Sequence, residues 1–170
     1  MSSVIVAGNT SGSVTLDAPA VSGSTVITLP TTTGTMMVNG PAFSAYAASP
    51  QSITSGVVTK VLFGTEEFDT NNNFASSTFT PTVAGYYQVN AQVYTGTPQS
   101  RLIFYIYKNG SSYKTGSDLN SSAYGTTMST LVYMNGSTDY LDVYVYFSST
   151  ANTQNAIGAT WFNGSMVRGA

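Results

Sequence analysis

The residues best able to do acid–base chemistry are few in this sequence, and their spacing does not suit it. Glu66 and Glu67 are adjacent, so on a strand they would point to opposite faces. Asp139 and Asp142 lie three positions apart at the start of an expected strand, so they also face opposite sides. A glycosidase needs two carboxylates that flank one bond. The pattern therefore argues against a polysaccharide-degrading enzyme, which we keep only as a third alternative.

Nucleophilic and metal chemistry lack their usual side chains. The sequence contains no histidine and no cysteine, which excludes a Ser-His-Asp triad, a disulfide and a thiolate zinc site. Asp69, Asp118 and Asp139 could bind calcium only if several hard oxygens converged on one ion, so weak calcium binding stays open. We expect a non-enzymatic protein with no catalytic residue, no cofactor and no metal.

The charge of the chain limits its partners. Only 7% of the residues are charged, with five Lys and Arg against seven Asp and Glu, so a basic surface for nucleic acid is not expected. No stretch reaches the roughly 18 apolar residues that a membrane span needs. The first 20 residues have neither a basic region nor a long apolar run, so we expect no secretory signal and no membrane insertion.

The elements that would position any site are β-strands. Helical periodicity is almost absent, and alternation of period two predicts about eight to ten antiparallel strands in a sandwich or jelly roll. The strands expected from this alternation are 42–47, 60–63, 77–80, 85–94, 101–107, 126–134, 140–147 and 156–167. The Asn-Gly pairs at Asn109 and Asn135 predict tight turns, because both residues accept positive φ.

The first 40 residues differ from the rest. They are poor in aromatic side chains, and two short β-prone runs, Ser13–Leu16 and Thr25–Leu29, need partners to be stable. Asn39-Gly40 marks the boundary. We therefore expect an N-terminal segment, 1–40, and a head domain, 41–170.

The expected strand 101–107 is apolar or aromatic on both faces. Leu102, Phe104 and Ile106 alternate with Ile103, Tyr105 and Tyr107. One face enters the core, and the other needs a cover. Either a second copy of the chain or a long loop of the same chain could provide it.

Residues 41–170 resemble the C1q/TNF-like family of trimeric jelly-roll domains. The resemblance is carried by PAFSAY (41–46), KVLFGTEEFDTNNNF (60–74), STFTPTVAGYYQVNAQV (77–93), IYKNG (106–110), MNGSTDYLDVYVY (134–146) and TWFNGSMV (160–167). Unlike the vertebrate members, the chain has no cysteine and no collagen-like stem. The resemblance implies a homotrimer in which an edge of each subunit packs on the inward sheet of its neighbour. It places Tyr105, Tyr107 and Tyr133 at the packing edge, and Phe43, Leu131, Trp161 and Phe162 on the inward sheet.

The segment Val14–Gly40 is similar to one found in phage tail-fibre and virion-decoration proteins. With the missing signal, it implies a protein made in the host cytoplasm and carried on the outside of a phage particle, with 1–40 binding other virion proteins. The expected function is a fibre or tip module whose loops adhere to a host-surface glycan or outer-membrane receptor. The alternative is a capsid decoration, cement or head-fibre protein without host recognition. The expected solvent loops are Asn71–Phe74, Ser111–Tyr124 and Ser148–Asn155. The candidate receptor-facing residues in these loops are Asn71, Asn72, Asn73, Tyr113, Asp118, Tyr124, Asn152 and Asn155.

Overall fold

The computed structural model describes residues 3–7, 10–17 and 40–170. They belong to two compact units, and Gly40 to Ala170 lie in the larger one. The expected strand Thr25–Leu29, Asn39 of the expected turn, and most of the phage-like segment lie outside the described residues.

The smaller unit is an antiparallel hairpin of β1 (Ser3–Ala7) and β2 (Ser13–Asp17). Val4 pairs with Leu16 and Val6 pairs with Val14, so these four apolar side chains share one face. All four are more than half exposed. A two-stranded hairpin of this kind has little stability alone, so its apolar face needs a partner.

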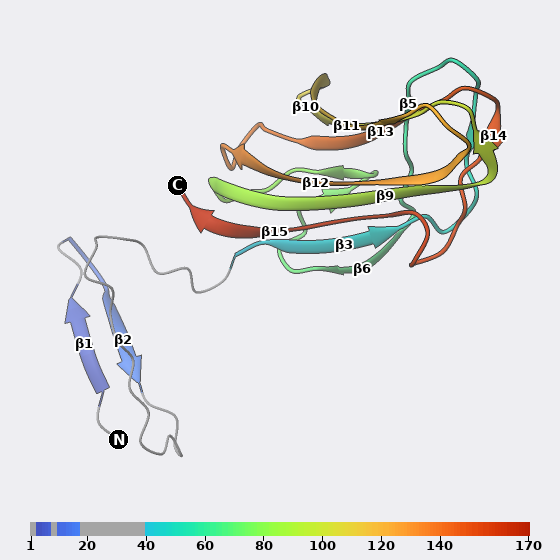
Figure 1. Cartoon of the computed structure of the whole chain (residues 1–170). Helices are drawn as coiled ribbons and strands as arrows, with labels where there is room; N and C mark the ends of the chain where they lie inside the picture. The colour runs from blue at the N-terminus through green and yellow to red at the C-terminus, as the bar shows by residue number, and fades with distance from the viewer. Residues whose placement is uncertain (1–2, 8–9, 18–39) are drawn as a thin grey trace, which may run out of the picture. The chain divides into compact units, whose positions relative to one another are not determined.

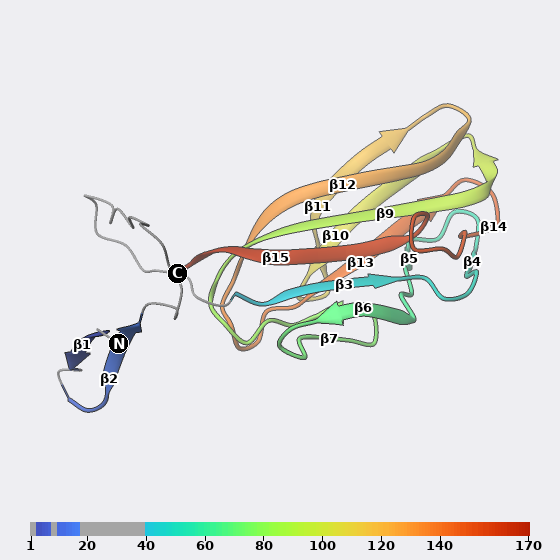
Figure 2. The same cartoon turned by 90° about the horizontal axis from the view of Figure 1, so that it is seen from below.

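The larger unit is a sandwich of two antiparallel sheets, and its described residues form strands without helices (Figure 1). Sheet I has the order β12-β9-β15-β3-β6, and sheet II has the order β11-β10-β13-β8-β7, with β5 also paired to β13. Figure 2 shows the strands of sheet I in front of β10, β11 and β13 of sheet II. The bounds are β3 Ala42–Tyr46, β4 Ser52–Ile53, β5 Thr59–Lys60, β6 Thr65–Asp69, β7 Phe74–Ala75, β8 Thr78–Phe79, β9 Gly85–Gln99, β10 Leu102–Lys108, β11 Ser111–Leu119, β12 Ala123–Met134, β13 Leu141–Phe147, β14 Ala151–Asn152 and β15 Trp161–Gly169.

The core is built from every second residue of the long strands. Along β9, Tyr87, Val89, Ala91 and Val93 are all fully buried, and the residues between them reach the outer face. The same alternation along β10 and β13 fills the other side of the core. The period-two prediction for these strands is confirmed, because one face of each strand must leave water.

An aromatic cluster joins the two sheets. Phe43 on sheet I stacks on Phe74 and Phe79 of sheet II, with ring centroids 4.9 and 4.2 Å apart. Phe162 meets Phe43 edge-on at 4.9 Å. Phe43 and Phe162 are at most 1% exposed, so their placement in the trimer interface is wrong: both side chains point between the sheets.

The two ends of the sandwich carry different turns and loops. At the end that we call proximal, Pro41 accepts a hydrogen bond from the Met166 amide and Ala84 accepts one from Ala170, so the chain enters and leaves there. The turns at 70–73, 109–110 and 135–139 lie at the same end. The opposite, distal end carries the loops 48–51, 95–101, 120–122 and 148–160.

Three local predictions need correction. Ser111–Tyr124 is not a loop, because Ser111–Leu119 pairs with β10 as strand β11. The last strand begins at Trp161 rather than at residue 156. Of the expected strand 60–63, only Lys60 belongs to a strand. The Asn109-Gly110 turn is confirmed, with φ of 54° and 76°.

The position of Phe43 gives a stability prediction. We expect Phe43→Ala to lower the free energy of unfolding by about 3–5 kcal/mol, because it removes a ring that contacts both sheets. Val57→Ala is the control, since Val57 is 50% exposed and its truncation should change little. Urea unfolding followed by fluorescence measures both. Equal effects of the two substitutions would contradict the assignment of Phe43 to the core.

Candidate self-association surface

The outer face of sheet I, on the side away from the core, exposes large apolar side chains. Tyr86, Leu131 and Tyr133 are 40%, 51% and 41% exposed. Tyr133 pairs with Tyr86 across β12 and β9, and their rings lie 5.5 Å apart. Trp161, on the same face of β15, is half-buried. Leu131, Tyr133 and Trp161 of the predicted interface therefore share one surface.

Neutral polar side chains fill the middle of this face. Asn90 donates to Asn163 at 3.0 Å and accepts from the Ser129 hydroxyl at 2.7 Å. Gln88 donates to Ser129 at 2.8 Å. Because these amides already bond to one another, covering them would cost less than covering charges or unpaired polar groups.

A hollow of about 240 Å³ opens on the same face beside this network. Small residues, Ala42, Ser44 and Ser165, help to line it. Phe68 on β6 forms part of its wall and is 51% exposed. The face thus offers protruding side chains near β12 and a depression near β3 and β6.

Tyr105 and Tyr107 lie elsewhere, on the outer face of sheet II. Tyr107 stacks on Tyr144 with centroids 4.0 Å apart, and Tyr105 contacts Tyr107 edge-on. Burial raises the pKa of the Tyr105 hydroxyl, with a further contribution from Tyr107. β10 lies between β11 and β13, so the assignment of Tyr105 and Tyr107 to a packing edge is wrong. Tyr133, on the edge strand β12, does lie at an edge.

The double-faced character of β10 is present in the structure. Phe104 is fully buried in the core, and Ile103 on the opposite face is only 6% exposed. Neighbouring side chains of sheet II cover much of that second face.

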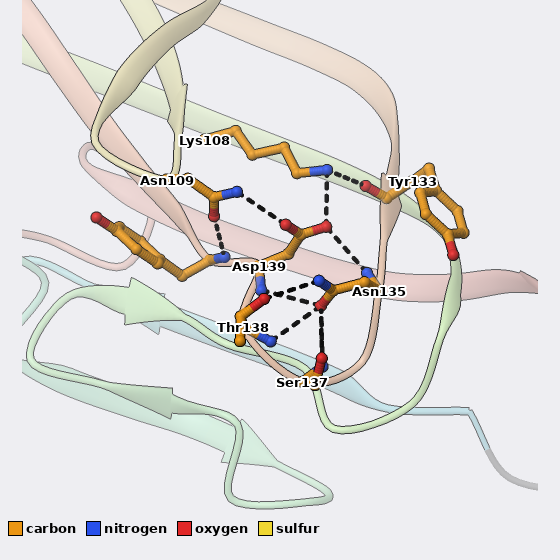
Figure 3. Close-up of polar contacts among 8 residues, drawn as sticks. Lys108, Asn109, Tyr133, Asn135, Ser137, Thr138 and Asp139 are labelled. Carbon is orange, nitrogen blue, oxygen red and sulfur yellow. Dashed lines mark hydrogen bonds and ion pairs between the residues drawn. The ribbon is translucent and has the colours of Figure 1, made fainter.

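A buried carboxylate ties together the proximal turns (Figure 3). Asp139 accepts hydrogen bonds from the Asn109 side chain at 2.8 Å and from the Asn135 amide at 3.0 Å. Lys108 Nζ lies 2.8 Å from Asp139 Oδ2 and 2.7 Å from the Tyr133 carbonyl. Burial opposes ionisation of Asp139, but these hydrogen bonds and the Lys108 charge outweigh it and lower its pKa. Each of these polar groups is hydrogen-bonded or ion-paired to another group of the chain, so we interpret the cluster as structural.

The Asn135 side chain shapes the turn that carries Asp139. Its Oδ1 accepts hydrogen bonds from the amides of Ser137, Thr138 and Asp139, each at 3.0 Å. Gly136 has φ of 70°, whereas Asn135 does not have positive φ, so only the glycine of this Asn-Gly pair takes the predicted conformation. Sequence reasoning found this turn but not its connection to Lys108.

The predicted receptor-facing residues do not form one group. Asp118, Tyr124, Asn152 and Asn155 lie toward the distal end, whereas Asn71, Asn72, Asn73 and Tyr113 lie toward the proximal end. Asn73 is only 4% exposed and bonds to the Asn71 carbonyl, so its exposure was wrongly predicted. At the distal end, Asn152 and Asn155 line a polar hollow of about 410 Å³.

The other acidic side chains of the head lie in ion pairs or on the edge strand β6. Asp142 pairs with Lys60 at 2.8 Å, and Asp118 pairs with Arg101 at 2.7 Å. Glu66 and Glu67 lie side by side on β6. Within 3–7, 10–17 and 40–170, no three acidic, His or Cys side chains are grouped to hold a metal ion. Those residues also include no helix long and apolar enough to cross a membrane.

Known structures share this fold. The globular domain of zebrafish complement 1qA is similar over 78% of this chain and 100% of that one, with 16% identity and a TM-score of 0.59. Murine APRIL at pH 5.0 is similar over 76% and 100%, with 12% identity and a TM-score of 0.60. The PRD1 vertex protein P5 is similar over 75% and 97%, with 15% identity and a TM-score of 0.52. The predicted C1q/TNF-like jelly roll is thereby confirmed as a fold.

Sequence comparison adds no relative to these. No family model matches the sequence, and no curated protein matches it. The resemblance of Val14–Gly40 to phage fibre segments therefore stays a prediction.

The proximal cluster predicts a pH effect. Because the pKa of Asp139 is lower in the folded state, its ion pair and hydrogen bonds stabilise the fold fully above the unfolded-state pKa of about 3.9. This contribution is lost as the pH falls through the lower folded-state pKa. Asp139→Asn should cost about 1–3 kcal/mol at pH 7, and the difference from the unsubstituted protein should shrink on acidification. Urea unfolding between pH 7 and pH 2 measures it.

The matched control for this prediction is Asp118→Asn. It removes an ion pair that lies in solvent, where water and salt screen the attraction, so it should change stability little. A difference between the Asp139 variant and the original protein that stays constant down to pH 2 would contradict the role assigned to the carboxylate.

Proposed function

We propose that this chain is a non-enzymatic structural protein of a bacteriophage particle, in which residues 41–170 form a homotrimeric head and residues 1–40 attach it. Self-association is supported above all by the outer face of sheet I. Leu131, Tyr133 and Tyr86 stand exposed beside amides that already bond to one another. A second copy could cover the middle of this surface at low cost, because the side chains there are neutral and already hydrogen-bonded.

The proposed mechanism is display. The chain enters and leaves the head at the proximal end, so the distal loops lie farthest from the point of attachment at Gly40. These loops are rich in amides and hydroxyls, which suit adaptable hydrogen bonding to a host-surface glycan or protein. Three copies would present the same loops, so weak single contacts combine into useful avidity.

The phage assignment has two supports. One is the resemblance of Val14–Gly40 to virion fibre and decoration segments, and the other is the shared fold with the PRD1 vertex protein P5. The likeness to a vertex protein also favours the second candidate, a decoration or head-fibre protein that binds the shell without recognising a host. Both candidates require residues 1–40 to bind another virion protein.

The first test is the mass of the full chain in solution. A homotrimer of 17.8 kDa chains has a mass of about 53 kDa, which should persist on dilution below micromolar concentration. Leu131→Asp should shift the protein toward the monomer, because it places a charge in the covered face. Val57→Asp is the control, since Val57 is equally exposed but lies in a turn hydrogen-bonded to the end of β13. A monomer at all concentrations would remove both the homotrimer and the avidity mechanism.

The second test separates adhesion from decoration. If the distal end binds the host, Tyr124→Ala, at the distal start of β12, should slow adsorption of the particle about tenfold, as loss of roughly 1.4 kcal/mol of binding would. Asn71→Ala, at the proximal end, should leave the adsorption rate unchanged. Binding of the purified protein to the shell with no effect of Tyr124→Ala on adsorption would favour decoration instead.

A further inference from the structure

The hollow at the distal end is lined mainly by neutral polar groups. Its volume of about 410 Å³ lies within the range of pockets that hold small molecules, roughly 300–1,000 Å³. Thr97, Asn152 and Gln154 line it with side chains that form no hydrogen bond within the described part of the chain. None of the residues in its lining is acidic or basic. The hollow can therefore donate and accept hydrogen bonds, but it offers no charge to a ligand.

Buried polar residues hold the segments around this hollow in place. The fully buried Gln99 side chain accepts a hydrogen bond from the Ser149 amide at 2.9 Å and donates one to the Thr97 carbonyl at 3.1 Å. Thr153 is 2% exposed; its hydroxyl accepts a hydrogen bond from the Gln51 amide at 3.0 Å, and its amide donates to the Gln51 carbonyl at 2.9 Å. The segments that form the hollow are thus bonded to one another, so a ligand need not order them when it binds.

An exposed aromatic pair stands beside the hollow. Tyr94 and Tyr124 are 38% and 46% exposed, and their rings stack with centroids 6.4 Å apart. Tyr94 and Gly96 are two residues apart on β9 and both exposed, so they lie on the same side of the strand. Gly96 lines the hollow, and the amide of Gln154, another lining residue, donates to the Tyr94 carbonyl at 2.7 Å. The tyrosine rings and the polar hollow are therefore adjacent.

An aromatic face next to amides and hydroxyls suits a sugar. The C–H face of a pyranose ring can pack on a tyrosine, while its hydroxyls bond to groups that both donate and accept. Two residues of a strand rise about 6.6 Å, roughly the length of one pyranose unit. An apolar ligand would leave the amides of the hollow unpaired, and an anion would meet no basic side chain in the lining.

We propose that the distal hollow and the Tyr94–Tyr124 pair form a binding site for an uncharged glycan. One sugar ring packs on the exposed tyrosines, and the next enters the hollow, where Asn152 and Gln154 bind its hydroxyls. The site lies within a single copy of the chain, so it does not depend on the homotrimer. This inference rests on the display function proposed above and names the chemical class of its ligand.

An array of bacterial surface polysaccharides with uncharged and acidic repeat units tests the ligand class. The probe is the labelled full-length protein. We expect it to bind one or more uncharged glycans, and we expect 1 M salt not to weaken this binding, because no charge contributes to it. Binding to acidic glycans alone, or to none of the glycans, would overturn the proposal.

Substitutions test the position of the bound glycan. Gln154→Ala and Tyr94→Ala should each weaken binding about tenfold, because each removes a contact with the sugar. Gly96→Leu should weaken it at least as much without removing a polar group, since a Cβ at Gly96 would lie 3.4 Å from Gln154 Nε2 and the larger side chain would fill the hollow. Asn71→Ala is the matched control, because it removes an exposed amide at the proximal end. Gln154 and Gly96 are exposed, so their substitution should leave the Tm unchanged.

The outcomes separate this site from the proposed function. Adsorption that Tyr124→Ala slows, with a protein that binds no glycan, would overturn the glycan site and leave display standing, with a protein as the receptor. Glycan binding that none of the three substitutions weakens would overturn the location of the site. Adsorption that Tyr124→Ala does not change, with a protein that binds no glycan, would overturn both the site and host adhesion.

Discussion

The stacking of Phe43 between the two sheets is the contact on which the head depends. Its ring lies against Phe74 and Phe79, which belong to short strands with few backbone hydrogen bonds of their own. The packing of that ring holds β7 and β8 against sheet I. These side chains fill the space between the sheets. Because side chains alternate along a strand, the residues between them lie on the outer faces of the sheets. The composition of the outer faces is therefore what distinguishes one use of this fold from another.

The long strands could be predicted from sequence because their alternation is strong, but the assignment of faces could not always be. Trp161 and Phe162 are adjacent, so on a strand only one of them can face the core. The sequence does not say which, and the interface prediction placed both on one surface. The structure puts Phe162 in the core and Trp161 outside. A stricter use of the alternation would have excluded either Trp161 or Phe162 from the predicted interface.

Strand β11 was missed for a different reason. Its residues are polar and mostly exposed, so they carry no apolar period. The signal that could have found it is the Asn109-Gly110 turn, since a two-residue hairpin requires a second strand after β10. The sequence also could not predict that Asn71–Asn73 and Asn152 lie at opposite ends of the sandwich, because this depends on how strands far apart in the chain pair.

The neighbouring entry and exit of the chain have a consequence for grafting. Pro41 and Met166 are hydrogen-bonded to each other, and so are Ala84 and Ala170. The head can therefore be inserted as a domain into a surface turn of an unrelated protein through short linkers, because both of its ends lie at one end of the sandwich. A peptide appended after Ala170 would emerge at the same end of the head as Gly40, whereas one inserted in 148–160 would emerge at the opposite end. Cargo orientation is thus selected by the site of insertion alone.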